Sequence, residues 1–242
     1  MAVKKGKPKK RIRKKKVLKV RPKKIPQKRA IKKSVAREPV LKSLLPCSKK
    51  EWEKVYAKRN FDTIPWNLGV PATELKAFLE MGLVPRGRAL DVGCGTGSNT
   101  IMLAKCGFHV IGIDCSPSAI ALAKDNAKRA RTHCTFWIGD ALHLNFPTGY
   151  FDFVFDRGCF NQLGNGNREK FIETIARVLA PHGWYQLVVL SPQSKDPNKF
   201  TKMKIQQLFS KHFDVQDVVE TSVLDKKTKK KTHFLVAIMQ KQ

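Results

Sequence analysis

Residues 89–98 read A-L-D-V-G-C-G-T-G-S, the most informative stretch of this sequence. An apolar run carries Asp91 near its end, and glycines follow at the alternate positions Gly93, Gly95 and Gly97. Glycine adopts a positive φ without a Cβ clash, and its missing side chain lets a ligand approach the backbone N–H and carbonyl groups. The stretch therefore predicts a strand that enters a tight turn, with a nucleotide-like ligand against the bare backbone of that turn.

The spacing of the glycines does not fit two common phosphate-binding turns. A dinucleotide-binding turn, G-x-G-x-x-G, needs a third glycine where Ser98 stands, because that glycine lets the next helix pack closely on its strand. A Walker loop needs Gly-Lys followed by Ser or Thr, and residues 93–105 hold no such triplet. The ligand of this turn therefore differs from those of both motifs.

An acidic side chain ends the next strand pattern along the chain. Residues 108–114, F-H-V-I-G-I-D, read as a short buried strand that ends at Asp114, 23 residues after Asp91. A carboxylate at that strand end can accept hydrogen bonds from both hydroxyls of a ribose. Alternatively, Asp114 caps the following helix, a role that Ser116 and Pro117 can also fill.

Two further strand patterns also end in acidic residues. Residues 135–141, T-F-W-I-G-D-A, end in Gly139 and Asp140, where Asp140 can instead open a turn. Residues 151–158, F-D-F-V-F-D-R-G, carry Asp156 near their end. Polar residues at successive strand ends predict an open parallel sheet with its ligand in the crevice along the carboxyl edge.

These patterns together resemble class I S-adenosylmethionine-dependent methyltransferases, in particular small-molecule enzymes of the thiopurine and tellurite-resistance type. The resemblance runs from about Trp52 to Gln242. It is most specific in residues 52–58 with 64–71, in the glycine turn, in the Gly-Asp strand end, and in residues 154–160 with 177–185. It implies an α/β, Rossmann-like, seven-stranded mixed sheet with helices on both faces, in which six strands are parallel and the last is antiparallel.

The resemblance also implies the cofactor and its contacts. The cofactor is S-adenosyl-L-methionine, and no metal is expected. The matching positions are Trp52, Tyr56 and Trp66 on a lid, Asp91, Gly93 and Gly95 around the methionine moiety, Asp114 on the ribose, and Asp140 with Ala141 on the adenine.

Asp156 and Arg157 are the candidate catalytic residues, because the resemblance puts the transferring methyl and the acceptor at the end of their strand. Methyl transfer from a sulfonium is an in-line displacement, so the protein mainly aligns donor and acceptor and excludes water. An acceptor that must lose a proton needs a general base, for which Asp156, His143 and His182 are candidates. Alternatively, Asp156 pairs with Arg157 or caps the following turn.

The positive charge of the chain is concentrated in its first fifth. Residues 1–50 hold 22 of the 48 lysines and arginines and one acidic residue, Glu38. Such a segment buries too little apolar surface to offset its ordering entropy. We expect a disordered Lys/Arg-rich tail over residues 1–46 and a methyltransferase domain over residues 47–242, in which 47–82 form a helical lid segment.

The tail suggests partners and a location. Residues 4–33 can contact nucleic acid or the ribosome through phosphate attraction, or they can be a solubilising tail without a partner. No apolar run approaches 18 residues, so no membrane span is expected. The six cysteines have no C-x-x-C spacing, which favours a reducing compartment. We expect an intracellular, monomeric protein in the cytoplasm, nucleus or nucleolus, with the mitochondrion a lesser alternative.

Three functions fit the sequence. The favoured one is methyl transfer to a small molecule. The alternatives are methyl transfer to RNA or to a nuclear or ribosomal protein, and RNA binding without catalysis. The chain has D-R-G-C-F after its fourth strand, where amino-directed nucleic-acid methylases carry Asp or Asn, two prolines and an aromatic residue. The alternative in which the protein methylates a nucleic-acid base is therefore disfavoured.

Overall fold

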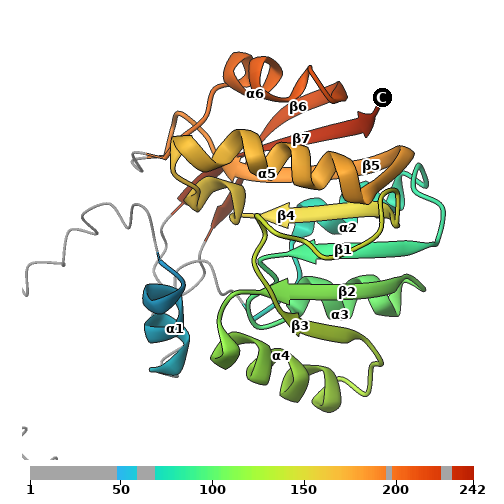
Figure 1. Ribbon diagram of the computed structural model, residues 1–242, viewed down its shortest axis with the longest axis vertical. Coiled ribbons are helices and arrows are strands. Elements are labelled where there is room, and N and C mark those ends of the chain that lie inside the picture. Colours follow the sequence, from blue (N-terminus) through green and yellow to red (C-terminus); the bar gives the residue numbers. More distant parts are fainter. Residues whose placement is uncertain (1–47, 59–68, 195–197, 225–230) are drawn as a thin grey trace, which may run out of the picture. The chain divides into compact units, whose positions relative to one another are not determined.

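Seven strands form one sheet in the order β3-β2-β1-β4-β5-β7-β6 (Figure 1). The structure is a computed structural model that describes residues 48–58, 69–194, 198–224 and 231–242. The expected tail over residues 1–46 and the predicted lid residue Trp66 lie outside these residues. The strands are β1 (Arg88–Val92), β2 (His109–Asp114), β3 (Thr135–Ile138), β4 (Phe151–Arg157), β5 (Leu179–Leu190), β6 (Phe213–Leu224) and β7 (Lys231–Lys241).

The direction of the strands confirms the expected mixed sheet. Neighbouring strands from β3 through β5 pair in parallel. Strand β7 pairs antiparallel with both β5 and β6, so β6 runs in the same direction as β1 to β5. Six strands are thus parallel and the last strand of the chain is antiparallel, inserted between β5 and β6.

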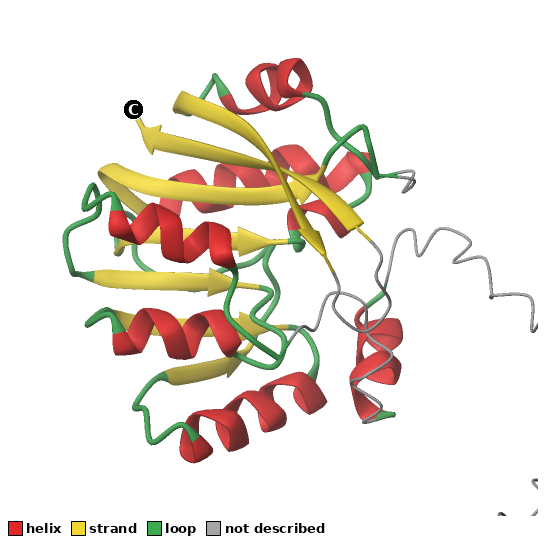
Figure 2. Cartoon of the chain, turned by 180° about the vertical axis from the view of Figure 1, so that it is seen from behind, coloured by secondary structure: helices red, strands yellow, loops and turns green. Residues whose placement is uncertain are grey.

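Helices cover both faces of the sheet, as expected (Figures 1 and 2). The helices of the described residues are α1 (Lys49–Ala57), α2 (Thr73–Glu80), α3 (Ser98–Lys105), α4 (Pro117–Arg129), α5 (Asn165–Val178), α6 (Lys202–Phe209) and the short 3₁₀ helix η2 (Phe160–Gln162), and α1 lies beyond the strand ends, not on a face. Helix α1 begins with a capping box, in which the Ser48 N–H donates to Glu51 Oε2 at 2.7 Å. Helix α6 was not expected from the sequence; its Ile205 and Phe209, four residues apart, are both buried.

The alternation of side chains along each strand divides the core into two layers. Ala89 of β1 packs with Leu75 of α2 and Leu103 of α3 on one face. Leu90, the next residue of β1, packs with Ile175 of α5 on the other. Successive strand residues point to opposite faces, so a strand buried on both faces is apolar at nearly every position. This explains why β1 and β4, between the terminal Arg88 and Arg157, are apolar except at their aspartates.

The register of the parallel strands brings the strand ends together. Val92 of β1 lies opposite Ile113 of β2 and Asp156 of β4. Asp114, the last residue of β2, lies opposite Ile138, the last residue of β3. The polar residues that the sequence analysis placed at strand ends therefore share one edge of the sheet. Within the described part of the chain, no helix has the length and apolar character needed to cross a membrane.

Candidate functional site

The glycine turn between β1 and α3 exposes its backbone to a narrow cleft. Gly93 has a φ of +67°, and a Cβ there would come within 2.8 Å of the Cβ of Cys159. Gly95 has a φ of +53°, and a Cβ there would come within 2.8 Å of the Tyr56 hydroxyl. Both the backbone conformation and the space require glycine. The cleft, of about 60 Å³, is lined by this turn together with Tyr56 of α1, Asn99 of α3 and Arg157 of β4.

Asp91 is buried beneath the turn. The Thr100 hydroxyl donates to its Oδ2 at 2.5 Å. Burial raises the pKa of Asp91 to about 7, although the hydrogen bonds from Thr100 oppose that shift. Asp91 thus joins the end of β1 to the start of α3 and helps to fix the turn between them. Its predicted contact with the methionine moiety stays a prediction.

Asp114 holds the turn from the neighbouring strand. Its Oδ2 accepts the Gly95 N–H at 2.9 Å, and its Oδ1 accepts the Ser116 N–H at 2.9 Å. Burial raises its pKa, against the lowering effect of these backbone hydrogen bonds. The cap of α4 is Ser116, whose hydroxyl accepts the Ala119 N–H at 3.1 Å. The alternative role of Asp114 as the helix cap is therefore filled by Ser116, and its ribose role stays a prediction.

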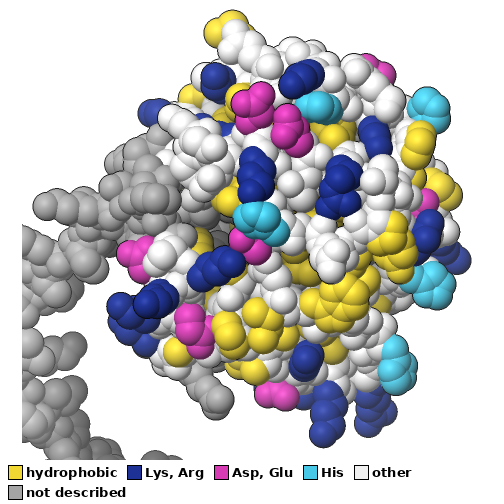
Figure 3. All heavy atoms as spheres, viewed as in Figure 1, with side chains coloured by type: hydrophobic (Ala, Val, Ile, Leu, Met, Phe, Trp, Pro, Cys, Tyr) yellow, Lys and Arg dark blue, Asp and Glu magenta, His cyan; other side chains and the backbone are white. Residues whose placement is uncertain are grey.

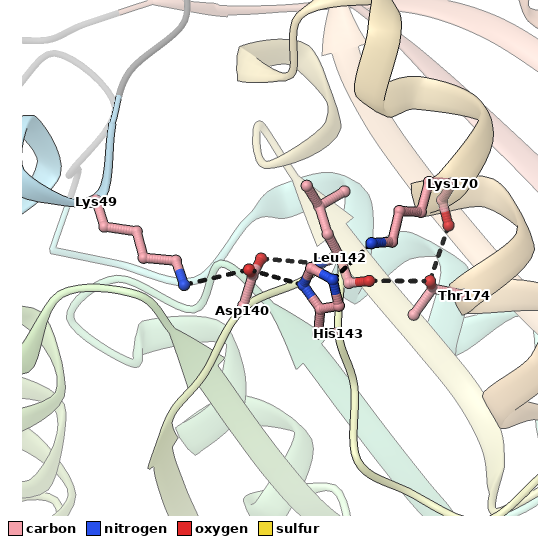
Figure 4. A network of polar contacts seen from close by, with 6 residues as sticks. All are labelled: Lys49, Asp140, Leu142, His143, Lys170 and Thr174. Carbon is pink, nitrogen blue, oxygen red and sulfur yellow. Dashed lines mark hydrogen bonds and ion pairs between the residues drawn. The ribbon is translucent and has the colours of Figure 1, made fainter.

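Asp140 lies at the centre of a polar network that joins three elements (Figure 4). Lys49 of α1 lies 3.2 Å from Oδ2, and the Leu142 N–H donates to Oδ1 at 3.0 Å. His143 Nδ1 lies 3.0 Å from Oδ2, and Lys170 Nζ of α5 lies 2.5 Å from His143 Nε2. Because an ammonium can only donate, Nε2 accepts and Nδ1 donates to Asp140.

These contacts set the charge of Asp140 and define its turn. Burial alone would raise its pKa, but the Leu142 N–H, His143 and Lys49 outweigh it and hold the pKa below the ordinary value. The backbone of His143 also donates to the Asp140 carbonyl at 2.9 Å, so Asp140 does open a turn, as the alternative interpretation proposed. Ala141 is half-buried against the apolar core. The adenine roles of Asp140 and Ala141 stay predictions.

Helix α1 is fastened over the strand ends by a residue that the sequence analysis missed. Glu53 Oε2 accepts the Ser116 hydroxyl at 2.7 Å, and Oε1 accepts the Ser118 hydroxyl at 2.5 Å. These hydrogen bonds lower the pKa of Glu53, and the bond from the Ser118 hydroxyl has the largest effect. They orient α1 so that Tyr56, with Trp52 packed beside it at a ring distance of 6.4 Å, closes on the glycine turn.

Asp156 is fully buried at the end of β4. Its Oδ1 accepts the Cys159 N–H at 2.8 Å and its Oδ2 accepts the Phe160 N–H at 3.0 Å. Burial raises its pKa to about 7, against these two hydrogen bonds. Asp156 therefore caps the turn that presses Cys159 against Gly93, one of the two roles proposed as alternatives to catalysis. Its catalytic role stays a prediction.

Arg157 pairs with an acid other than Asp156. Its Nε donates to Glu74 Oε1 at 2.7 Å, and both side chains are nearly buried. The guanidinium also lies 4.9 Å from the ring centre of Phe234. Glu74 was missed, yet it precedes Leu75 and lies four residues before Phe78 on the buried face of α2. A charged residue on an otherwise apolar helix face was the available signal.

The two histidines proposed as alternative bases lie in different places. His143 is engaged by Asp140 and Lys170, outside the cleft lining. His182 lies near the amino-terminal end of β5, away from the carboxyl edge that carries the glycine turn. The cleft therefore gathers Tyr56, Gly93, Gly95 and Arg157.

Comparison with known proteins gives the family. A methyltransferase domain model matches residues 89–183. The chain is 31% identical over 160 residues to a 2-heptyl-1-hydroxyquinolin-4(1H)-one methyltransferase of Mycobacteroides abscessus, a match that covers 64% of this chain and 70% of the relative. It is 30% identical to a probable thiol methyltransferase 2 of Arabidopsis thaliana, covering 54% and 58%. It is also 30% identical to an eEF1A lysine and N-terminal methyltransferase of Bos taurus, covering 58% of this chain and 21% of that protein.

Among solved structures, a similar fold is that of 1,6-didemethyltoxoflavin-N1-methyltransferase of Burkholderia thailandensis, which was solved with S-adenosylhomocysteine. The TM-score is 0.63 at 21% identity, and the match covers 80% of this chain and 87% of that one. The bare backbone of Gly93 and Gly95 lines the cleft, and the Asp114 carboxylate lies beside it and accepts the Gly95 N–H, an arrangement that fits such a cofactor. The chain belongs to the class I S-adenosylmethionine-dependent methyltransferases, with S-adenosylmethionine as its methyl donor.

Proposed function

We propose that this methyltransferase acts on a small-molecule acceptor with a nucleophilic, electron-rich atom. The observation that carries the proposal is the cleft itself, which has a volume of about 60 Å³ and is lined by Tyr56 of α1 and Arg157 of β4 together with the glycine turn. A cleft closed by a fastened helix suits one small group more than an extended protein surface. The relatives whose names specify a hydroxyquinolinone and a thiol support the same acceptor class.

The residues around the cleft suggest how the transfer proceeds. S-adenosylmethionine supplies an activated methyl group when bound. The protein aligns the acceptor in line with that group, an effect worth on the order of 7 to 11 kcal/mol. Helix α1, fastened through Glu53, keeps water away from the glycine turn.

Arg157 is the residue that we assign to the acceptor. Glu74 and Phe234 fix its guanidinium, so little side-chain freedom is lost when an acceptor binds. Glu74 contacts only Nε, so the other guanidinium N–H groups can donate to a deprotonated oxygen or sulfur, which is the better nucleophile. Asp156 then acts as a positioning residue, because its carboxylate holds the Cys159 turn against Gly93.

The test is transfer of labelled methyl from S-adenosylmethionine into cell lysate that has been separated into small-molecule, RNA and protein fractions. We expect label in the small-molecule fraction. We also expect Arg157→Ala to lower the transfer rate while calorimetric affinity for S-adenosylmethionine is retained. Glu80→Ala, which removes an exposed acid of α2, is the matched control. Label confined to RNA or protein would show that the proposed acceptor class is wrong.

A second candidate function is methylation of a protein or RNA recruited by the basic tail. It is supported by the similarity to the eEF1A lysine and N-terminal methyltransferase and by the 22 basic residues among the first 50. The same fractionation distinguishes this candidate, because its label appears in a macromolecular fraction. If no fraction is labelled although S-adenosylmethionine binds, catalysis itself is in question, and RNA binding without catalysis gains support.

A further inference from the structure

A large basic groove lies on the edge of the sheet opposite to the glycine turn. Its volume is about 840 Å³, within the size range of ligand sites. Its floor includes Arg88, His109 and Thr135, the first residues of β1, β2 and β3. Lys124 and Lys128 line it from α4. His109 and Asp114, at the two ends of β2, are five residues and therefore roughly 17 Å apart, so the groove and the glycine turn lie at opposite ends of the strands.

The lining of the groove carries positive charge. Lys124, Lys128 and Arg131 are exposed, and lysines at positions i and i+4 project from one face of α4. Among the described residues, the lining contains no Asp or Glu; Asp152 lies just outside, with Oδ2 4.0 Å from Arg88 Nε. Figure 3 shows Lys, Arg and His side chains gathered at this end, beside a patch of hydrophobic side chains (lower right). The groove is therefore suited to a polyanion.

A stack of aromatic rings begins at the same groove. Arg88 lies over the Tyr150 ring at 4.6 Å, and both residues line the groove. Phe146 stacks on Tyr150 at 5.8 Å with an angle of 18° between the rings. Trp137 of β3 stacks on Phe146 at 5.2 Å and 8°. Trp137 is 48% exposed, so the stack ends in an accessible indole ring.

We propose that this groove and the Trp137 stack form a docking site for single-stranded nucleic acid. Lys124, Lys128 and Arg131 contact successive phosphates, and a base stacks on the Trp137 indole, which every base can do because each has a π-face. An acidic peptide would match the charge but would leave the near-parallel ring stack unused. The basic tail can add phosphate contacts but has no aromatic residue, so the stacking component comes from the folded domain.

This site is separate from the proposed acceptor cleft. It lies at the amino-terminal edge of the parallel strands, whereas the cleft lies at their carboxyl edge. Single-stranded nucleic acid held in the groove is a docking partner. The bases that contact the groove are not methyl acceptors. The inference therefore stands whether the methyl acceptor is a small molecule or a macromolecule.

The stacking half is tested with the full chain and a fluorescein-labelled oligouridylate, by fluorescence anisotropy. Trp137→Ala should weaken binding roughly fivefold to a hundredfold, and Trp137→Phe should retain most of the affinity. Met203→Ala on α6, which removes a side chain that is 69% exposed, is the matched control and should have no effect. Equal affinities for Trp137→Ala and Met203→Ala would overturn the proposal, and Trp137→Phe provides the readout if the alanine variant folds poorly.

The phosphate half is tested by salt dependence. Lys124→Glu with Lys128→Glu should reduce the slope of log affinity against log salt by about 1.4, the value for two contacts to a single strand. Lys202→Glu with Lys204→Glu on α6 changes the charge by the same amount and should leave the slope near its original value. The tail is present in every variant, so its contribution cancels in these comparisons. Identical slopes for the two double variants would overturn the proposal.

Two further measurements separate this proposal from its rivals. If Trp137→Ala dissociates a dimer in light scattering and leaves oligouridylate binding unchanged, the aromatic patch covers a second copy of the chain and the proposal fails. Calorimetric affinity for S-adenosylmethionine should be the same in all variants. A chain that binds oligouridylate through Trp137 but transfers no methyl would refute the proposed function and leave the docking site intact.

Discussion

Replacing Gly95 by alanine tests the link between the glycine turn and the helix above it. The backbone φ of +53° costs an alanine about 1 to 2 kcal/mol, because its Cβ approaches the following carbonyl oxygen. The added Cβ also meets the Tyr56 hydroxyl at 2.8 Å, whereas the next atom of that ring, Cζ, lies at an ordinary 3.7 Å. The perturbation therefore has a backbone part and a steric part, and only the steric part depends on the Tyr56 oxygen.

A double-mutant cycle with Tyr56→Phe separates the two parts. Urea unfolding gives the stability of each variant, and calorimetry gives its affinity for S-adenosylmethionine. We expect Gly95→Ala to lower the free energy of unfolding by the backbone penalty with either Tyr or Phe at position 56. The loss of stability should be larger with Tyr56, because its hydroxyl forces α1 to shift. In the Tyr56→Phe background the loss should fall to about 1 to 2 kcal/mol. If Gly95→Ala is equally damaging with Tyr and with Phe, the hydroxyl contact is not the obstacle, and a harmless Gly95→Ala would refute the description of the turn.

Three further predictions concern the buried charges. Glu74→Ala leaves the Arg157 guanidinium without its buried partner and should lower the free energy of unfolding, measured in urea, by about 3 to 5 kcal/mol. The control Glu80→Ala breaks an exposed pair with Lys76 and should lower it by at most about 1 kcal/mol. Equal losses of stability would contradict the burial argument. Burial holds the pKa of Asp91 at about 7, above the unfolded value, so its contribution to stability is full at low pH and is lost as the pH rises through 7. The free energy of unfolding should therefore decline less steeply in Asp91→Asn than in the wild type, by up to about 1.4 kcal/mol per pH unit between about pH 4 and 7. If plots of the free energy of unfolding against pH are parallel for the two proteins, the reasoning is wrong. Asp114→Ala should weaken S-adenosylmethionine binding by about 1 to 3 kcal/mol in calorimetry, with the exposed Asp125→Ala as control, and an unchanged affinity would exclude the ribose role.

The fold was largely predictable because local pattern and long-range packing agree. The strand around Asp91 appears as its apolar pattern indicated. The buried residues of α4, Ala119, Ile120, Ala123 and Ala127, recur at helical spacing. The seven-stranded arrangement with an antiparallel last strand was expected from the family resemblance. Helix α6 was missed, because an eight-residue helix with two buried side chains carries a weak periodic signal.

The part of the site formed by residues at the carboxyl ends of neighbouring strands was predictable from the sequence. The glycine turn meets Asp114 through the Gly95 N–H, as neighbouring strand ends in one sheet should. The partners in contacts between distant segments could not be identified from local sequence: Glu53 reaches Ser118 across 65 residues, and Glu74, although it stands out on an apolar helix face, reaches Arg157 across 83. Trp66 lies outside the described residues, so its place on the lid stays a prediction.

The position of β7 in the sheet has a consequence for the growing chain. Strand β7 follows β6 in sequence but lies between β5 and β6, and it pairs with both. Until residues 231–241 have been synthesised, β6 has no neighbour in the sheet and β5 presents an unpaired edge. Unpaired edges of this kind template association with other chains. A ribosome stalled before β7 therefore holds a chain in which β1 to β5 can pair, while β5 and β6 keep unpaired edges that can associate with other chains.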